Sequence, residues 1–302
     1  MTAVTTAELA PTPAAALLAA LARRDQIAAR LLIVVAHPDD ETIAAGAQLC
    51  RWADALLVHV TNGAPRDGID AAAHGFAGIE DYAAGRRFEL GAALRAGEAA
   101  RLRTAEFGIP DKTAYLALVE ITRRIAGLIS AEHPAAILVH AYEGGHPDHD
   151  AAAFAVHAAC DLTAAADRPA IIEVPLYHAL GGRFSTGQFL PDEAVDACQP
   201  FGRTGSDAVG VLAGETVLAL GPEEQDRKRR MIDCFTSQRQ LLAGFGTGSE
   251  RFRAAPRYDF GKPPHLGALN YEGLGWDITG AEWRRCAVAA LAALGLDRGP
   301  CR

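Results

Sequence analysis

Six consecutive apolar residues, Leu31 to Ala36, restrict most strongly how this chain can fold. The run contains Ile and Val and lacks the apolar–polar alternation of a half-exposed strand, so it predicts a central parallel strand covered on both faces. An acidic pentapeptide, His37-Pro38-Asp39-Asp40-Glu41, follows it, and residues 42–52 are helical in composition. A second apolar run, Ala55 to Val60, completes a strand–helix–strand unit, which takes a right-handed crossover in nearly all known cases.

The rest of the chain continues this alternation. Residues 135–140 and 170–174 are further expected strands, and a long glycine-rich loop is expected over residues 62–84. Helices are expected over four segments: 14–30, 86–106, 112–132 and a segment that ends near residue 166. The pattern predicts an α/β fold, a Rossmann-like, doubly wound, mostly parallel sheet with helices on both faces.

Beyond residue 181 the pattern weakens, with a hairpin expected at residues 208–220 and helices at 223–242 and 283–294. We therefore expect a single domain over residues 1–302. Its core comprises about residues 31–180, and a C-terminal elaboration comprises about residues 181–302.

Composition excludes several classes of partner. The net charge is −8, from 29 Lys and Arg against 37 Asp and Glu, without a basic run that would bind a nucleic-acid backbone. No apolar stretch reaches the ~18–20 residues that span a bilayer, and no secretory signal begins the chain, so we expect a cytoplasmic protein. Six widely spaced cysteines without a CxxC pair indicate neither a disulfide framework nor a thiolate zinc site. The oligomeric state stays open, a homo-oligomer included.

Two polar clusters follow buried strands, at residues 37–41 and 146–150. In open α/β sheets, ligands bind outside the carboxyl ends of the strands, where the strand order reverses. A dinucleotide site would need a glycine-rich first turn, whereas three carboxylates there would repel a pyrophosphate. Imidazoles combined with carboxylates instead favour zinc or another late divalent metal. Three protein ligands and one open position are typical of a catalytic zinc.

Together these motifs resemble the paired signature of the PIG-L/LmbE-like family of zinc-dependent N-deacetylases. The residues that carry the likeness are His37-Pro38-Asp39-Asp40-Glu41 and, after a later strand, His146-Pro147-Asp148-His149. Arg95-Ala96-Gly97-Glu98 resembles the Arg-x-x-Glu helix segment of the family, and the likeness covers about residues 31–176. The family includes deacetylases of N-acetylglucosaminyl-phosphatidylinositol, of mycothiol and bacillithiol precursors, and of glycosylated antibiotics.

The resemblance implies three metal ligands in this chain, which are His37, Asp40 and His149. Asp39 matches the carboxylate that takes a proton from the attacking water. His146 matches an imidazole that, when protonated, stabilises the oxyanion and donates to the leaving amine, with Asp148 as its electrostatic partner. These roles agree with the chemistry, because amide hydrolysis needs a base for the water and a donor for the oxyanion.

Two further residues are candidates for substrate binding, Arg95 and Asp111. A salt-bridged surface arginine and a turn or N-cap aspartate are the alternative interpretations of these residues. Asn62 and Arg66 follow the second strand and face the same edge. Tyr142 lies four residues before His146, whereas some relatives place a tyrosine two residues before the matching histidine, so we assign it no catalytic role.

The resemblance implies a zinc-dependent N-deacetylase, an amidohydrolase acting on linear amides, with one Zn²⁺ per chain or another divalent metal such as Fe²⁺ in the cell. The expected substrate is an N-acetylated amino sugar or its small-molecule conjugate, which would yield acetate and a free amine. Two alternatives remain: an amidase that acts on a larger amide conjugate, and a catalytically inactive metal- or carbohydrate-binding protein.

Overall fold

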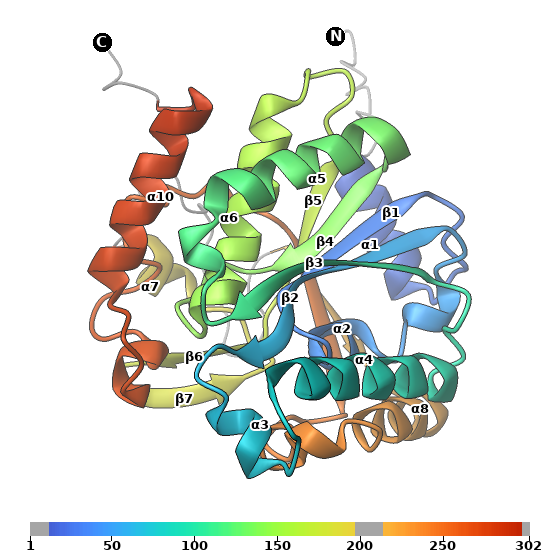
Figure 1. Cartoon of the computed structure of the whole chain (residues 1–302). Helices are drawn as coiled ribbons and strands as arrows, with labels where there is room; N and C mark the ends of the chain where they lie inside the picture. The colour runs from blue at the N-terminus through green and yellow to red at the C-terminus, as the bar shows by residue number, and fades with distance from the viewer. Residues whose placement is uncertain (1–11, 197–213, 298–302) are drawn as a thin grey trace, which may run out of the picture.

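A seven-stranded sheet forms the centre of the protein in the computed structural model, which describes residues 12–196 and 214–297 (Figure 1). Five neighbouring strands are parallel and two antiparallel strands extend the sheet at one edge. In spatial order the strands are β3 (Arg103–Asp111), β2 (Ala55–Pro65), β1 (Leu31–Val35), β4 (Ala136–His140), β5 (Ala170–Val174), β9 (Ser249–Ala254) and β8 (Glu215–Ala219).

Helices cover both faces of this sheet, as expected for a doubly wound α/β fold (Figure 1). One face carries α1 (Pro13–Ala22), α2 (Asp40–Ala45), α4 (Ile79–Ala96) and α8 (Pro222–Ile232). The other face carries α5 (Leu118–Glu132), α6 (Pro147–Leu162) and α10 (Gly280–Leu294). The short elements are α3 (Ile69–Ala73), α7 (Asp192–Asp196), α9 (Arg239–Leu242), a hairpin of β6 (Tyr177–Leu180) and β7 (Arg183–Thr186), and the 3₁₀ turns η1 (Leu49–Arg51), η2 (Ala114–Leu116), η3 (Thr236–Gln238) and η4 (Asn270–Leu274).

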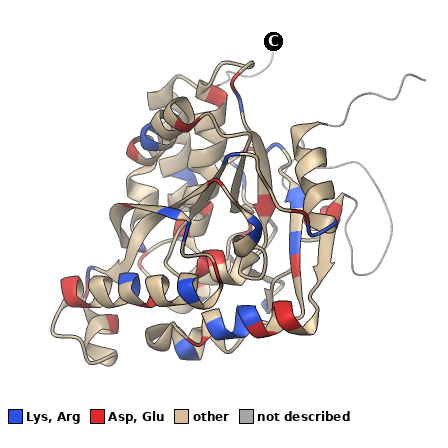
Figure 2. Ribbon diagram, turned by 90° about the vertical axis from the view of Figure 1, so that its right-hand side faces the viewer, with Lys and Arg blue, Asp and Glu red and all other residues tan. Residues whose placement is uncertain are grey.

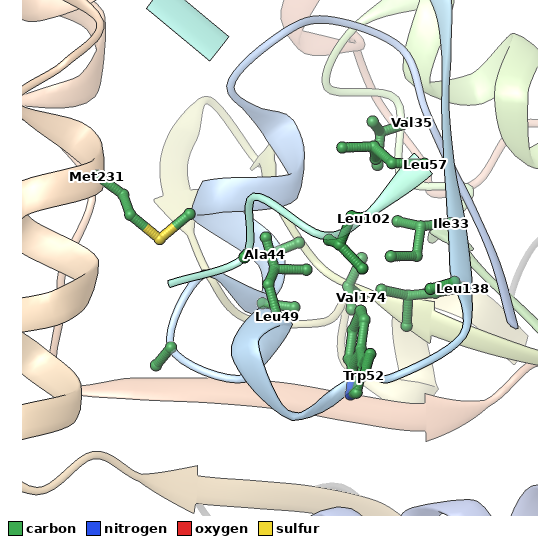
Figure 3. Packing of buried hydrophobic residues seen from close by; sticks show 14 of the residues in the cluster. Ile33, Val35, Ala44, Leu49, Trp52, Leu57, Leu102, Leu138, Val174 and Met231 are labelled. Carbon is green, nitrogen blue, oxygen red and sulfur yellow. The ribbon is translucent and has the colours of Figure 1, made fainter. Parts of the chain in front are cut away.

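Strand β1 divides the core because its successive side chains point to opposite faces. Ile33 and Val35 pack beneath α2 and α4 in a cluster that includes Met231 from the C-terminal part of the chain (Figure 3). Leu32 and Val34 pack against α5 and α6 on the other face. All five residues of β1 are buried, which confirms the strand expected from the apolar run.

Several expectations about secondary structure are wrong, including the loop over residues 62–84, which contains the end of β2, all of α3 and the start of α4. The segment expected to be helical up to residue 106 ends its helix at Ala96 and then forms β3, an edge strand whose residues are mostly half-buried. The helix expected over residues 14–30 ends at Ala22. The expected hairpin falls partly on residues outside the described part of the chain, and its described portion, β8, pairs instead with the distant β9.

The four cysteines within the described residues, Cys50, Cys160, Cys234 and Cys286, are free thiols. Cys198 and Cys301 lie outside that part of the chain. Among the described residues, no helix combines the length and the apolar character that crossing a bilayer requires.

Helix α8 connects the C-terminal region to the first strand–helix unit through hydrogen bonds of its residue Lys228. Its first turn carries Glu223 and Glu224 and its last turn Arg229 and Arg230, the order that complements the helix dipole. Figure 2 shows acidic and basic residues distributed over the whole described ribbon. On its inner side, the buried Lys228 ammonium donates to the Ile43 carbonyl at 2.7 Å.

A buried ion pair completes this connection. The Lys228 Nζ lies 3.0 Å from Glu250 Oε1 of β9, and the same oxygen accepts the Ala47 amide after α2. We expect Lys228→Met to lower the free energy of unfolding by about 3–5 kcal/mol, because it leaves a buried carboxylate without its cation. Chemical denaturation measures this. A loss under about 1 kcal/mol, as for an exposed pair, would mean that the connection contributes little.

Candidate metal centre

The strand order reverses between β1 and β4, and polar side chains gather at the carboxyl ends of these strands. His37 follows β1, and His140 ends β4. His146 and His149 lie at the start of α6, for which His146 is the N-cap residue. Asp111 ends β3, and the expected meeting of the two sequence motifs at this edge is therefore confirmed.

Donor atoms of these residues form three groups that could hold a metal ion, all nearly or fully buried. The groups are His37, His146 and His149; Asp40, His140 and His149; and His37, Asp111, His146 and Asp148. His140 belongs to one of these groups although the sequence analysis did not include it among the candidate residues. Its position at the end of an apolar strand, at the edge where the ligands meet, was the available signal.

Hydrogen bonds to the backbone limit what two of the four histidines can do. The Asp148 amide donates to His146 Nδ1 at 3.1 Å, and the Ala36 amide donates to His140 Nε2 at 2.9 Å. A neutral imidazole has one N–H and one acceptor nitrogen. His146 therefore carries its proton on Nε2 and His140 carries its proton on Nδ1. Neither ring can offer a second lone pair to a metal while its backbone bond persists.

In the part of the chain that the structure describes, the rings of His37 and His149 accept no backbone amide, and both lie close to Asp40, whose Oδ2 accepts the His37 amide at 2.7 Å. Asp40 Oδ2 is 3.3 Å from His37 Nδ1, and Asp40 Oδ1 is 3.4 Å from His149 Nε2. Two imidazoles and one carboxylate are a donor set that suits zinc or a similar divalent ion. The residues present therefore fit the expected metal.

Burial and neighbouring charges shift the pKa values in this cluster in opposite directions. Burial tends to raise the pKa of Asp40, but the His149 and His140 rings outweigh it and hold that pKa well below its usual value. Burial also tends to lower the pKa of His37, yet Asp111, Asp148 and Asp40 raise it well above the ordinary value. Asp40 is thus held as a carboxylate, the form that binds a cation.

Asp39 lies beside this set without belonging to any of the three groups. It precedes α2 with φ 131° and ψ −28°, a backbone conformation that residues other than glycine rarely adopt. Glu41 Oε2 accepts its amide at 3.1 Å, and the same oxygen lies 3.1 Å from His59 Nε2. Burial raises the pKa of Asp39 well above its usual value, against the opposing effect of Arg86. A carboxylate with a raised pKa is a stronger base.

Asp148 does not accompany His146 in the way the sequence suggested. Its carboxylate accepts the amides of Lys112 at 2.6 Å and Ala114 at 2.9 Å, and lies 3.4 Å from His37 Nε2. Burial, followed by the nearby His37, lowers the pKa of His146 well below its ordinary value. Because His146 Nδ1 accepts an amide and the Asp148 carboxylate bonds to other groups, this geometry favours a neutral His146 ring over the cationic ring expected from the sequence.

Asp111 belongs to the cluster, since its Oδ1 lies 2.9 Å from His37 Nε2 and 3.7 Å from His146 Nε2. Arg95 does not. It is exposed near the end of α4, about 13 Å along the helix from Arg86 at 1.5 Å per residue. The spacing Arg-x-x-Glu also occurs at Arg86 and Glu89, and these two residues are buried. Sequence reasoning missed Arg86, which donates to Asp39 Oδ2 at 3.2 Å.

Tyr142 faces away from the cluster. It is buried, its hydroxyl donates to the Lys262 carbonyl at 2.8 Å, and its ring stacks on Trp283 at 5.4 Å. Beside the site, a cleft of about 590 Å³ is lined by Asn62, Arg66, residues 77–81 and Pro110. Trp276, from the C-terminal region, packs on the His146 ring with 4.8 Å between ring centroids.

Comparisons with known proteins agree with this architecture. Residues 32–160 match the family model described as PIG-L: GlcNAc-PI de-N-acetylase. The zinc inhibited form of teicoplanin deacetylase Orf2 is similar at 20% identity and a TM-score of 0.54, over 76% of this chain and 99% of that one. The A40926 pseudoaglycone deacetylase Dbv21 is similar at 18% identity and 0.53, over 76% and 98%.

A third solved structure, N,N'-diacetylchitobiose deacetylase from Pyrococcus horikoshii, is 14% identical with a TM-score of 0.48, over 80% of this chain and 90% of that one. No curated protein matches the chain by sequence. At such identities the first two structural matches establish a shared fold.

Proposed function

The chain belongs to the PIG-L/LmbE-like deacetylase family, and from that premise we propose that it removes the N-acetyl group from an amino sugar conjugate. The products are acetate and a free amine. The observation that carries the proposal is the buried cluster at the strand switch point, in which Asp39 stands beside the candidate ligands without joining them. A protein that only bound metal would not need this additional carboxylate.

His37, Asp40 and His149 hold the metal in this proposal, and zinc is the first choice because two imidazoles and one carboxylate are a donor set that suits it. Fe²⁺ is the alternative in the cell. When bound, the ion supplies Lewis-acid polarisation of the amide carbonyl and lowers the pKa of water. The carboxylates of Asp111 and Asp148 lie 2.9 Å and 3.4 Å from His37 Nε2 and hold the His37 ring in place.

Asp39 accepts the proton of the attacking water as the C–O bond forms. The His146 Nε2–H donates a hydrogen bond to the oxyanion, as a neutral donor rather than as an imidazolium. When the C–N bond breaks, Asp39 returns its proton to the departing nitrogen. This last step replaces the role first expected of His146, because a neutral imidazole has no proton of low enough pKa to give to the amine.

In this proposal, the polar part of the conjugate beyond the N-acetyl group lies in the cleft that Asn62 and Arg66 help to line. Glycopeptide substrates are suggested by the similar teicoplanin and A40926 deacetylases. The substrate is a small molecule in this proposal.

The test is a panel of N-acyl amino sugar conjugates of increasing acyl length, in which acetate, other acids and free amine are all measured. We expect acetyl conjugates to be hydrolysed fastest. Preference for long acyl or amino-acyl chains would favour the larger-amide alternative, and binding without any turnover would favour an inactive carbohydrate-binding protein.

His146→Ala is expected to keep the metal and to lower kcat by about 10²–10³-fold with little change in KM, because one oxyanion donor is lost. The reason for metal retention is that His146 Nδ1 accepts a backbone amide and Nε2 carries the proton. Elemental analysis and steady-state kinetics on one preparation measure both quantities. Loss of the metal in this variant would make His146 a ligand instead of a donor.

A further inference from the structure

We infer that Arg86 is a positioning residue for the general base, which fixes one oxygen of Asp39 so that the other faces the attacking water. The inference rests on the proposed hydrolysis. It concerns a residue of α4 whose side chain reaches the turn between β1 and α2. Arg86 is 3% exposed, so its guanidinium must find its partners inside the protein.

Three oxygen atoms surround this guanidinium. Nη1 donates to the Gly63 carbonyl at 2.8 Å, and Nη2 donates to the Pro38 carbonyl at 2.8 Å and to Asp39 Oδ2 at 3.2 Å. The contacts therefore include both the peptide before Asp39 and its carboxylate. The guanidinium group is planar and its N–H donors point in fixed directions, so it holds the three oxygen atoms in one geometry. A lysine ammonium does not have fixed donor directions.

The site is shaped to admit this side chain. Gly63 has φ +66°, and a Cβ placed there would lie 2.9 Å from the guanidinium carbon and from Nη1 of Arg86. A side chain at residue 63 would therefore be strained and would displace the guanidinium. Glycine at the end of β2 is thus what lets the arginine reach Pro38 and Asp39.

The strained backbone of Asp39 explains why such support is needed. A non-glycine residue with φ 131° persists only where its surroundings fix it, and such strain costs on the order of 1–3 kcal/mol. Glu41 holds the Asp39 amide, and Arg86 holds the preceding carbonyl and Oδ2. Within the described residues, Asp39 Oδ1 has no hydrogen-bond partner, so it is the oxygen left to accept a proton.

Arg86→Ala tests the inference, with Arg87→Ala as the matched control because Arg87 is the next residue and its half-exposed side chain pairs with Glu106. We expect Arg86→Ala to keep its metal and its KM, and to lower kcat by about 10²-fold, the cost of a misplaced catalytic group. Added guanidinium should restore part of this kcat, whereas urea, which is planar and uncharged, should not. Arg87→Ala should behave as the wild type.

A double-mutant cycle separates positioning from direct substrate binding. If Arg86 acts only through Asp39, adding Arg86→Ala to Asp39→Asn costs no further kcat. Multiplying losses, or a raised KM with unchanged kcat, would overturn the inference and would make Arg86 a substrate-binding residue. If Arg86→Ala does not fold, Arg86→Lys is used, with a smaller loss expected because the ammonium cannot bridge all three oxygens.

A crystal structure of the Arg86 variant gives a readout that does not depend on activity. The Asp39 side chain should leave its position or occupy more than one rotamer. An unmoved, single Asp39 rotamer would overturn the inference even in a protein without deacetylase activity. An inactive wild type would instead overturn the proposed function, so the two failures are distinguishable.

Discussion

Asp39→Asn is expected to lower kcat by about 10²–10⁴-fold while the protein keeps its metal. The amide is nearly isosteric with the carboxylate, and its oxygen can still accept from Arg86 Nη2, so the turn before α2 should keep its geometry. What is lost is the group that accepts the proton of water. Steady-state kinetics and elemental analysis of the same preparation measure the two expectations together.

The control for this variant is Asp54→Asn, the same change at a half-exposed residue just before β2, at the opposite edge of the sheet, where Asp54 pairs with Arg30. It should leave kcat unchanged. Near-normal turnover of Asp39→Asn with full metal content would mean that another group activates the water. Loss of metal from this variant would place Asp39 among the ligands.

His149→Ala is expected to lose most of the bound metal and to reduce turnover to background. His149 Nε2 faces Asp40 Oδ1 at 3.4 Å, and its ring is not held as a backbone acceptor as the rings of His140 and His146 are. His37→Ala should have the same effect. Metal stoichiometry measured after dialysis against metal-free buffer decides this, beside circular dichroism to show that the fold is retained.

The comparison with His146→Ala makes this prediction specific. Both rings lie in one donor group with His37, but only His149 is expected to be needed for binding. Full metal occupancy in His149→Ala, or equal metal loss in both variants, would remove the proposed ligand set.

The central part of the fold could be predicted from the sequence because strands buried on both faces have a distinctive composition. The runs at residues 31–36 and 135–140 correspond to β1 and β4, and the structure places the switch point between these two strands. Strand β3 could not be found in this way. Its residues, Arg103 to Asp111, lie at the sheet edge and are mostly half-buried, so they carry no apolar run.

The site could be predicted as far as its residues are adjacent in sequence. The two motifs identified the edge and six of the polar residues, and Asp111 was found after a proline. The hydrogen bond that His146 Nδ1 accepts could not be predicted, since it comes from a backbone amide that reaches Nδ1 only when α6 begins there. Arg86 was missed because the Arg-x-x-Glu spacing occurs twice, at residues 86–89 and at residues 95–98. Only the burial of the first pair distinguishes it from the second.

The most direct test of the account is a metal titration of the chelator-treated protein, followed by measurement of acetate release from an N-acetylated amino sugar conjugate. The account predicts that activity is absent after chelation, rises in proportion to added Zn²⁺, and stops rising at about one ion per chain, the number that a three-ligand catalytic site holds. Activity that persists after complete removal of the metal, or a protein that binds one ion and releases no acetate, would contradict it.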